Sequence, residues 1–177
     1  MNKQVWIEKA LGLGIQEFEI YQSTTVEKEM TWFQGQMDTL VSSKVTGTSI
    51  RGIVDGKMAN MALEEIDDSM CETVLKSLIE QAHIISNEET DSLRKPEAIE
   101  YVKKDVTWNM ASTEYVKDIL QSLEAKILAY DPRVIQVGYL GYSQGSGSRS
   151  IVNSLGMDVQ DADEMQYIVA SVVVKEE

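Results

Sequence analysis

The first part of the chain combines a helical hydrophobic period with strand-like alternation. Apolar side chains recur at helical spacing over residues 3–12, and Gly12 and Gly14 end this run, so we expect a helix there. The next segments alternate apolar and polar positions with a period of two, which is typical of β-strands. These segments are residues 16–23, 25–35 and 37–47, with a turn predicted at Gly35-Gln36.

A tight hairpin is predicted next, within residues 48–63. Asp55-Gly56 stands between two alternating runs. Both positions of such a turn need a positive φ, which Asp and Gly tolerate, so this dipeptide is a strong hairpin signal.

An amphipathic helix follows the hairpin. Ser69 and Glu72 have the spacing of a capping box, and Asp67 and Asp68 suit the positive end of the helix dipole. We expect this helix to end near residues 86–87. Its predicted apolar face consists of Cys71, Val74, Leu75, Leu78, Ile79, Ala82 and Ile85.

The second part of the chain repeats this order after a polar segment. Residues 88–111 are weakly patterned and contain Pro96, which indicates an extended linker along the surface. A helix is expected over residues 113–130, where Asp131-Pro132 stops it. Its predicted buried side consists of Tyr115, Val116, Ile119, Leu120, Leu123, Ile127 and Leu128. The predicted strands cover residues 133–144, 148–154 and 165–174, with a turn at Gly145-Ser146-Gly147 and another turn and strand within residues 155–164.

The two halves align at a constant shift of about 120 residues, which indicates an internal duplication. The matched positions are Ile15-Gln16 with Ile135-Gln136, Ser23 with Ser143, Met37-Asp38 with Met157-Asp158, and Ile50 and Ile53 with Ala170 and Val173. The predicted fold is α+β, with duplicated helix-plus-sheet units (α-β-β-β-β-α, then α-β-β-β-β) and antiparallel or mixed sheets. We expect one domain over residues 1–177, with repeats at 1–87 and 112–177 and a linker at 88–111.

The closing run of residues 165–174 raises the question of completeness. In the first half the equivalent run is followed by Asp55-Gly56 and a returning strand, whereas the second half stops where its own turn is expected. We therefore expect a fragment of a longer protein, truncated before a further domain, or a short gene product.

Composition argues against several classes of function. The net charge is −13, from 29 acidic and 16 basic residues, and phosphate neutralisation needs clustered Lys and Arg. No apolar run approaches the roughly 20 residues of a membrane span, and the N-terminus lacks the apolar segment of a secretory signal. The chain has a single cysteine, so it has no internal disulfide. These features predict a cytoplasmic protein that binds neither nucleic acid nor membranes.

Catalytic motifs are sparse. His83 and Cys71 are the only histidine and cysteine; they lie about three turns apart on one predicted helix and cannot share a metal ion within this chain. We interpret His83 as a boundary residue and Cys71 as a core residue, with a thiolate at the helix N-terminus as the alternative. Residues 141–145 match Gly-x-Ser-x-Gly around Ser143, but we expect a Gly/Ser hairpin loop where that motif needs a strand-to-helix turn.

Acidic groups and aromatic residues are the remaining candidates. The acidic groups could bind calcium or act as acid and base, but helix capping and a solvated turn are simpler interpretations. The aromatic residues could form a ligand platform, but packing is the commoner role. The acidic groups are Glu64-Glu65, Asp67-Asp68 and Asp161/Asp163/Glu164, and the aromatic residues are Trp32-Phe33 and Trp108. We assign no catalytic, cofactor-binding or metal-binding residue.

The order of segments resembles the N-terminal domain of the TldD/PmbA family, whose members are also called modulators of DNA gyrase or TldE-type proteins. Residues 18–63 carry the resemblance in the first half, although Met58-Ala59-Asn60 departs from the family's usual Gly-Phe ending. The matching positions are Gly47, Arg51, Asp55-Gly56-Lys57, Ala62, Asp131-Pro132-Arg133-Val134 and Asn153-Ser154-Leu155-Gly156.

The resemblance implies a function that the residues alone do not show. Full-length family members are two-domain proteins that pair as dimers. TldD-type subunits carry a His-Glu-x-x-x-His zinc motif in a later region and act as proteases on unfolded or peptide substrates, in microcin maturation and antitoxin degradation, whereas PmbA/TldE-type subunits lack the motif. This chain contains neither the motif nor the later domain, so no active-site residue carries over and zinc belongs to the C-terminal region of the family.

By this resemblance the chain is a non-catalytic domain of a metallopeptidase system, acting as chamber wall and subunit-interface scaffold. Its partner would be a homo- or heterodimeric subunit, and an unfolded peptide could add to the edge of a strand at Ile168–Val174. A stand-alone peptide-binding module is the alternative. The third hypothesis is a hydrolase that uses carboxylates such as Asp38 or Asp158, although no carboxylate pair has a geometric reason to converge.

Overall fold

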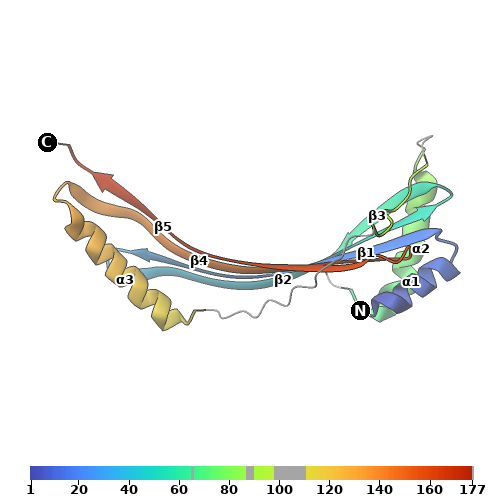
Figure 1. The fold of residues 1–177 in the computed structure, drawn as a ribbon, viewed down its shortest axis with the longest axis horizontal. Helices are drawn as coiled ribbons and strands as arrows, with labels where there is room; N and C mark the ends of the chain where they lie inside the picture. The colour runs from blue at the N-terminus through green and yellow to red at the C-terminus, as the bar shows by residue number, and fades with distance from the viewer. Residues whose placement is uncertain (65, 87–89, 98–110, 177) are drawn as a thin grey trace. The chain divides into compact units, whose positions relative to one another are not determined.

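The computed structural model describes residues 1–64, 66–86, 90–97 and 111–176. Helices and strands are both present, which confirms the predicted α+β class (Figure 1). In chain order the elements are α1 (Lys3–Gly12), β1 (Glu17–Phe33), β2 (Gln36–Val54), β3 (Lys57–Leu63), the 3₁₀ helix η1 (Asp68–Met70), α2 (Cys71–Ile84), α3 (Thr113–Tyr130), β4 (Val134–Asn153) and β5 (Asp158–Val174).

The strands form one five-stranded sheet in the order β3-β2-β1-β4-β5 (Figure 1). β2 and β3 pair in antiparallel register from Thr48↔Leu63 to Val54↔Lys57. Between them Asp55 and Gly56 have φ angles of 49° and 74°. The predicted Asp-Gly hairpin is therefore confirmed, because both turn residues adopt the left-handed conformation that the turn requires.

Fewer and longer strands are present than the sequence pattern predicts. β1 runs without interruption through the boundary expected near residue 24, and β4 runs through Gly145-Ser146-Gly147, so the predicted turn at these residues is wrong. Neither of these two glycines has a positive φ. The order α-β-β-β-β-α, then α-β-β-β-β, is accordingly replaced by α1-β1-β2-β3-α2, then α3-β4-β5.

The bounds of the long strands agree with the shift between the two halves. Phe33 and Asn153 end β1 and β4, and Val54 and Val174 end β2 and β5; the members of each pair are 120 residues apart. A helix precedes both strand pairs, so the order helix-strand-strand occurs twice. The strand β3 and the helix α2 have no counterpart among the described residues of the second half.

The chain packs as two compact units that interleave the halves of the sequence. Unit 1 consists of residues 1–24, 46–105 and 148–162, and unit 2 consists of residues 25–45, 106–147 and 163–177. β1, β2, β4 and β5 therefore each contribute residues to both units.

In unit 1, α1 and α2 lie against the sheet (Figure 1). α1 has the bounds predicted for it, and Asn2 caps it by accepting a hydrogen bond from Val5 N. The capping box predicted at Ser69 and Glu72 is wrong: Ser69 lies in η1, where its N–H donates to the Asp67 carboxylate. The main core residues are Trp6, Ile7, Ala10, Ile15, Phe18, Ile20, Ile50, Val54, Cys71, Val74, Leu75, Leu78 and Ala82.

In unit 2, α3 covers one face of the sheet and has the predicted bounds. Ser112 caps the helix by accepting from Tyr115 N. The helix turns Val116 and Leu120 into the core, but Tyr115 and Leu128, which were predicted to be buried, are 60% and 44% exposed. The core is completed by Met30, Trp32, Val137, Leu140 and Tyr142.

Candidate functional site

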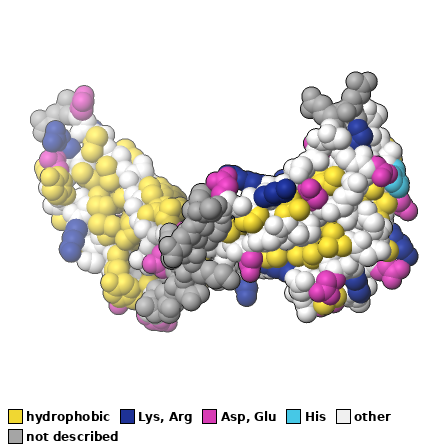
Figure 2. All heavy atoms as spheres, turned by 45° about the vertical axis from the view of Figure 1, so that its right-hand side comes forward, with side chains coloured by type: hydrophobic (Ala, Val, Ile, Leu, Met, Phe, Trp, Pro, Cys, Tyr) yellow, Lys and Arg dark blue, Asp and Glu magenta, His cyan; other side chains and the backbone are white. Residues whose placement is uncertain are grey.

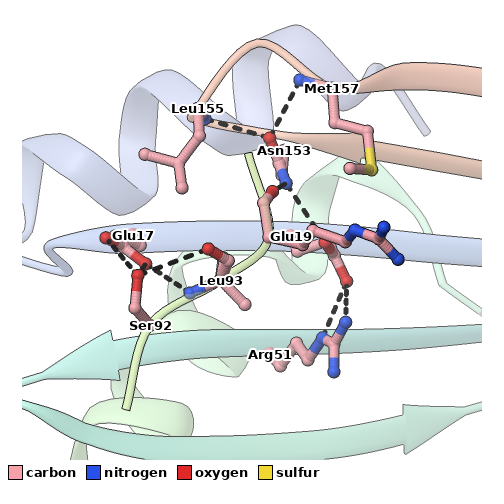
Figure 3. Close-up of polar contacts among 9 residues, drawn as sticks. Glu17, Glu19, Arg51, Ser92, Leu93, Asn153, Leu155 and Met157 are labelled. Atoms are coloured by element: carbon pink, nitrogen blue, oxygen red, sulfur yellow. Dashed lines mark hydrogen bonds and ion pairs between the residues drawn. The ribbon is translucent and has the colours of Figure 1, made fainter. Parts of the chain in front are cut away.

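A buried carboxylate lies at the centre of the unit 1 sheet. Phe18 and Ile20 of β1 pack into the core with α1 and α2, so Glu19 between them projects from the opposite face. Glu19 is only 2% exposed. Its Oε1 accepts from Arg51 Nε at 2.7 Å and Nη2 at 2.6 Å, and its Oε2 accepts from Asn153 Nδ2 at 3.2 Å (Figure 3). The buried charge is thus fully paired by residues of the neighbouring strands β2 and β4.

The same face holds the segment of residues 90–97 that follows α2. Leu93 N donates to Glu17 Oε2 at 2.6 Å, and Ser92 Oγ donates to both oxygens of this carboxylate (Figure 3). Asn153 Nδ2 also donates to the carbonyl oxygen of Arg94 at 2.9 Å. The described part of the predicted linker, residues 90–97, is fixed by side chains of β1 and β4.

Asn153 also organises the turn between β4 and β5. Its Oδ1 accepts from Leu155 N and Met157 N, each at 3.0 Å (Figure 3). Gly156 has a φ of 95°, which favours glycine at this position. The Asn-Ser-Leu-Gly match to the family is therefore explained as a turn whose first residue is bonded to the turn itself, to Glu19 of β1 and to residues 90–97.

The candidate metal and nucleophile residues of the sequence occupy structural positions. Cys71 is fully buried, and burial raises the pKa of its thiol, which favours the core interpretation over a thiolate. His83 is exposed, with Nε2 3.7 Å from Asp55 Oδ2. Within the described ranges, no group of three or more His, Cys, Asp or Glu side chains is placed to hold a metal ion.

The acidic groups also make local contacts. Asp67 accepts from Ser69, and Asp68 Oδ1 accepts from Asn2 N at 2.8 Å and from Trp6 Nε1 at 2.9 Å. These hydrogen bonds hold the pKa of both carboxyl groups below the usual range. The solvated turn predicted at residues 161–164 is wrong, because these residues belong to β5. Glu64 is exposed, and Glu65 lies outside the described residues.

The remaining candidates divide between packing and strand positions. Trp32 is buried and donates through Nε1 to Glu124 Oε2 at 2.8 Å, so it packs rather than forming a ligand platform; Trp108 lies outside the described residues. Ser143 lies within β4, not on a strand-to-helix turn, although the hairpin loop expected there is also absent. Asp38 and Asp158 belong to different units.

The hydrophobic pattern of the sequence did not indicate Glu19 and Glu124 as buried carboxylates, because their hydrogen-bond partners are distant in sequence.

Unit 2 exposes both edges of its part of the sheet. β5 is the last strand in the sheet order, and β3 pairs with β2 only from Thr48 to Val54. In the described structure the stretch 36–47 of β2 therefore borders only β1. Ile168–Val174, which the sequence singled out as a candidate strand edge, lies on the outer strand β5.

The face of unit 2 opposite α3 is rich in exposed apolar side chains. Gln166 Nε2 donates to Tyr142 Oη in the α3 core, so Met165 and Tyr167 point away from α3. Thr31 points away from α3 because its neighbour in β1, Trp32, is buried in the α3 core. The Oγ1 atoms of Thr31 and Thr39 share a hydrogen bond at 2.6 Å, so Thr39 lies on the same face as Thr31. Met37 and Val41 are two positions from Thr39 in β2 and therefore also point away from α3. We call this surface the open face; its large apolar residues are Phe33, Met37, Val41, Val45, Tyr139, Met165, Tyr167, Val169 and Val173.

The large apolar side chains of the open face are accessible to solvent. Exposed fractions of its apolar residues run from 37% for Phe33 to 62% for Val45. Tyr139 lies over Gly141, where an added Cβ would clash with the ring and Oη of Tyr139. Burial raises the pKa of Tyr139, and the neighbouring Glu29 and Tyr167 act in the same direction. Figure 2 shows hydrophobic side chains over much of the visible surface of the part that contains α3.

Comparisons with known proteins place this arrangement in a family. Residues 18–86 match a family model described as PmbA/TldA metallopeptidase domain 1, and residues 107–177 match the PmbA/TldA metallopeptidase central domain. No curated protein sequence matches the chain. None of the described helices is long and apolar enough to cross a membrane.

Three solved structures share the fold at low sequence identity. A proposed modulator of a DNA gyrase from Thermotoga maritima is 18% identical with a TM-score of 0.83, and TldE from Thermococcus kodakarensis is 19% identical with a TM-score of 0.81. A proposed modulator of DNA gyrase from Bacteroides thetaiotaomicron is 18% identical with a TM-score of 0.75. Each match covers 98% of this chain but only 39%, 39% and 40% of the respective structure, so the chain spans about two fifths of their length.

Proposed function

Because this chain belongs to the PmbA/TldD metallopeptidase family, we propose that it acts as a non-catalytic domain that forms chamber wall and subunit interface in a larger peptidase assembly. The open face of unit 2 is the observation that carries this proposal. The nine large apolar side chains defined above are about two fifths to three fifths exposed, which amounts to several hundred Å² of surface, comparable with the largest apolar patch of a typical monomer (roughly 300–600 Å²), which is often functional. A surface of this kind is typical of a contact with further protein.

Zinc chemistry is assigned elsewhere in such an assembly. The sequence contains one histidine and one cysteine, and no group of potential ligands converges in the described part of the chain. These residues do not fit a zinc centre, which needs at least three converging donors. The role of this chain is therefore contact and enclosure, in the cytoplasm, with a family-type subunit as partner and an unfolded peptide as the enclosed substrate.

Site-specific crosslinking tests this proposal. Cys71 is buried, so a photoreactive maleimide on Val41→Cys or Val173→Cys reports on the open face alone. The variants are purified, labelled and added to a lysate of the source organism, where we expect both to crosslink to a PmbA/TldD-family metallopeptidase polypeptide, identified by mass spectrometry. Gln121→Cys on the outer side of α3 is the matched control and should give no such product. Equal labelling from all three positions, or products without a family polypeptide, would contradict the proposal.

The open edge of β5 favours a second candidate function. An extended peptide could add to this strand through backbone hydrogen bonds, and apolar side chains line it from Met165 to Val174. This is the function of a stand-alone peptide-binding module. It predicts that the purified chain binds an unfolded fluorescent peptide by itself, and that Ile168→Lys weakens binding at least tenfold because charge blocks a strand edge. Gln121→Lys on the exposed side of α3, away from both open strand edges, is the control that should leave the affinity unchanged.

A further inference from the structure

Arg51 pairs with the buried Glu19 through one edge of its guanidinium group, and the other edge is directed toward the surface. Both Nε and Nη2 of Arg51 donate to the same oxygen of Glu19. The side chain of Glu19 is 3% exposed, whereas that of Arg51 is 44% exposed. Within the described structure Glu19 is the partner of Arg51, so the Nη1 edge of the fork faces outward. A guanidinium fixed along one edge is preorganised to bind a second carboxylate along the other.

A cavity of about 290 Å³ opens beside this guanidinium. Its lining consists of Glu19, Tyr21, Ser49, Arg51, Asn60 and Ile151. These residues come from β1, β2, β3 and β4, and Asn60 is the direct cross-strand partner of Arg51. The Asn60 amide and the Ser49 hydroxyl add neutral donors next to the guanidinium. The cavity is therefore formed by rigid sheet positions of unit 1.

A second hollow of about 400 Å³ shares Tyr21 and Ile151 with the first. Val159 adds an apolar side chain to its lining, Arg149 adds a second guanidinium group, and Asp161 adds a carboxylate. The two hollows together provide a place for an anionic head beside Arg51 and for an apolar group over Tyr21 and Ile151. Sites for small ligands commonly combine an apolar lining with a few placed polar groups in this way.

We infer that these hollows form a binding site for a carboxylate attached to an apolar group, such as the carboxyl-terminal residue of a peptide or a small apolar carboxylic acid. The carboxylate accepts hydrogen bonds from Arg51 Nη1 and Nη2, and the apolar group packs on Tyr21 and Ile151. Glu19 lines the cavity, but its charge is already paired with Arg51, so it acts as a positioning residue that fixes Arg51. The inference does not rest on the proposed function, because every residue of this site belongs to unit 1 and none to the open face.

Binding to the unmodified chain provides the first test. The probes are N-acetyl-leucine, N-acetyl-leucine amide, acetate, and a tripeptide ending in leucine with a free or an amidated carboxyl group. We expect both leucine acids to shift the Arg51 Nε–Hε resonance in NMR spectra of ¹⁵N-labelled protein, with at least tenfold weaker binding of the amides and of acetate. A tighter tripeptide acid identifies a peptide terminus as the ligand, and equal affinity of the two acids identifies a small carboxylic acid. Acids and amides that bind equally would overturn the inference.

Variants of the lining provide the second test. Asn60→Asp places a negative charge beside the outer edge of Arg51 at an exposed position, so we expect at least tenfold weaker binding of N-acetyl-leucine with an unchanged melting temperature. Arg51→Lys should weaken binding similarly because it loses the bidentate geometry. Arg133→Lys, in unit 2, is the matched control. Unchanged affinity in Asn60→Asp would overturn the site, whereas Val41→Lys and Val173→Lys on the open face should leave it intact and so separate it from the proposed function.

Discussion

Glu124 fixes the turn between β1 and β2 in unit 2. Its Oε2 accepts from Trp32 Nε1 at 2.8 Å and from Gly35 N at 2.9 Å, and the residue is 8% exposed. Gln34 and Gly35 of this turn have φ angles of 49° and 80°. One helix carboxylate thus satisfies a buried indole and a backbone donor of a strained turn at the same time.

We predict that Glu124→Ala destabilises the chain by about 1–3 kcal/mol, because the buried Trp32 indole and the partly buried Gly35 N–H both lose their acceptor. Glu124→Gln should lose less than about 1 kcal/mol, since the amide oxygen can accept both bonds. Urea unfolding of both variants measures the difference, with Glu114→Ala in the first turn of α3 as an exposed control. Equal stabilities of the Ala and Gln variants would contradict the role assigned to this acceptor.

Asp68 links η1 to the start of α1, and its contribution depends on pH. The hydrogen bond from Asn2 N, followed by that from Trp6 Nε1, holds its pKa below the ordinary 3.8. A lowered pKa stabilises the fold at pH values above 3.8, and this contribution disappears as the pH falls through the folded-state pKa. We predict that Asp68→Asn lowers the melting temperature by a few degrees at pH 7 and that this difference shrinks below pH 3.8. Asp118→Asn, on α3, is the control, and a difference that persists at low pH would contradict the assignment.

Single residues show where sequence reasoning stops. The alternation of β1 places Glu19 opposite Phe18 and Ile20, but its burial depends on Asn153, 134 residues away. Glu124 meets Trp32 across 92 residues. No local period encodes such pairings, so the carboxylates that matter most in the structure were missed, whereas core positions such as Cys71 were predicted correctly from helical spacing.

At the scale of elements, glycine occupies a tight turn in the β2–β3 hairpin but an extended strand position in β4. Gly56 has a φ of 74°, and an added Cβ would lie 2.8 Å from Thr90 Cγ2. Gly145 has no positive φ, and its nearest heavy atoms would be 3.8 Å away. The sequence pattern treated both as turn residues, because composition does not distinguish a glycine in a turn from one in an extended strand.

We predict opposite effects of alanine at these two positions. Gly56→Ala should destabilise the chain by about 1–2 kcal/mol because a Cβ is strained at positive φ. Gly145→Ala should be neutral or stabilise by about 0.5 kcal/mol, since glycine weakens the interior of a strand. Thermal unfolding of the two variants measures this contrast. A strong loss of stability in Gly145→Ala would favour the turn that the sequence pattern predicted.

At the scale of the whole molecule, the duplicated order of elements and the packing units do not coincide. The strand ends repeat at a spacing of 120 residues, yet each unit takes strand segments from both halves of the sequence. The helices, the Asp-Gly hairpin and the α+β class were predictable because they depend on local periods and turns. The continuity of the strands and the exposure of the open face were not, because they depend on which segments pair over long distances.

The exposed apolar side chains of the open face lead to a prediction about dye binding by the isolated chain. Exposed apolar surface binds the dye ANS, and Val45 and Met165 are the most exposed large residues of this face, at 62% and 61%. We predict that the double variant Val45→Lys, Met165→Lys reduces ANS fluorescence several-fold and keeps the melting temperature within a few degrees, because surface substitutions change stability little. Leu128→Lys on α3, at 44% exposure, is the control and should retain most of the signal. Dye binding that is unaffected by the double variant, or lost equally in the control, would mean that the open face is not the main apolar contact surface of this protein.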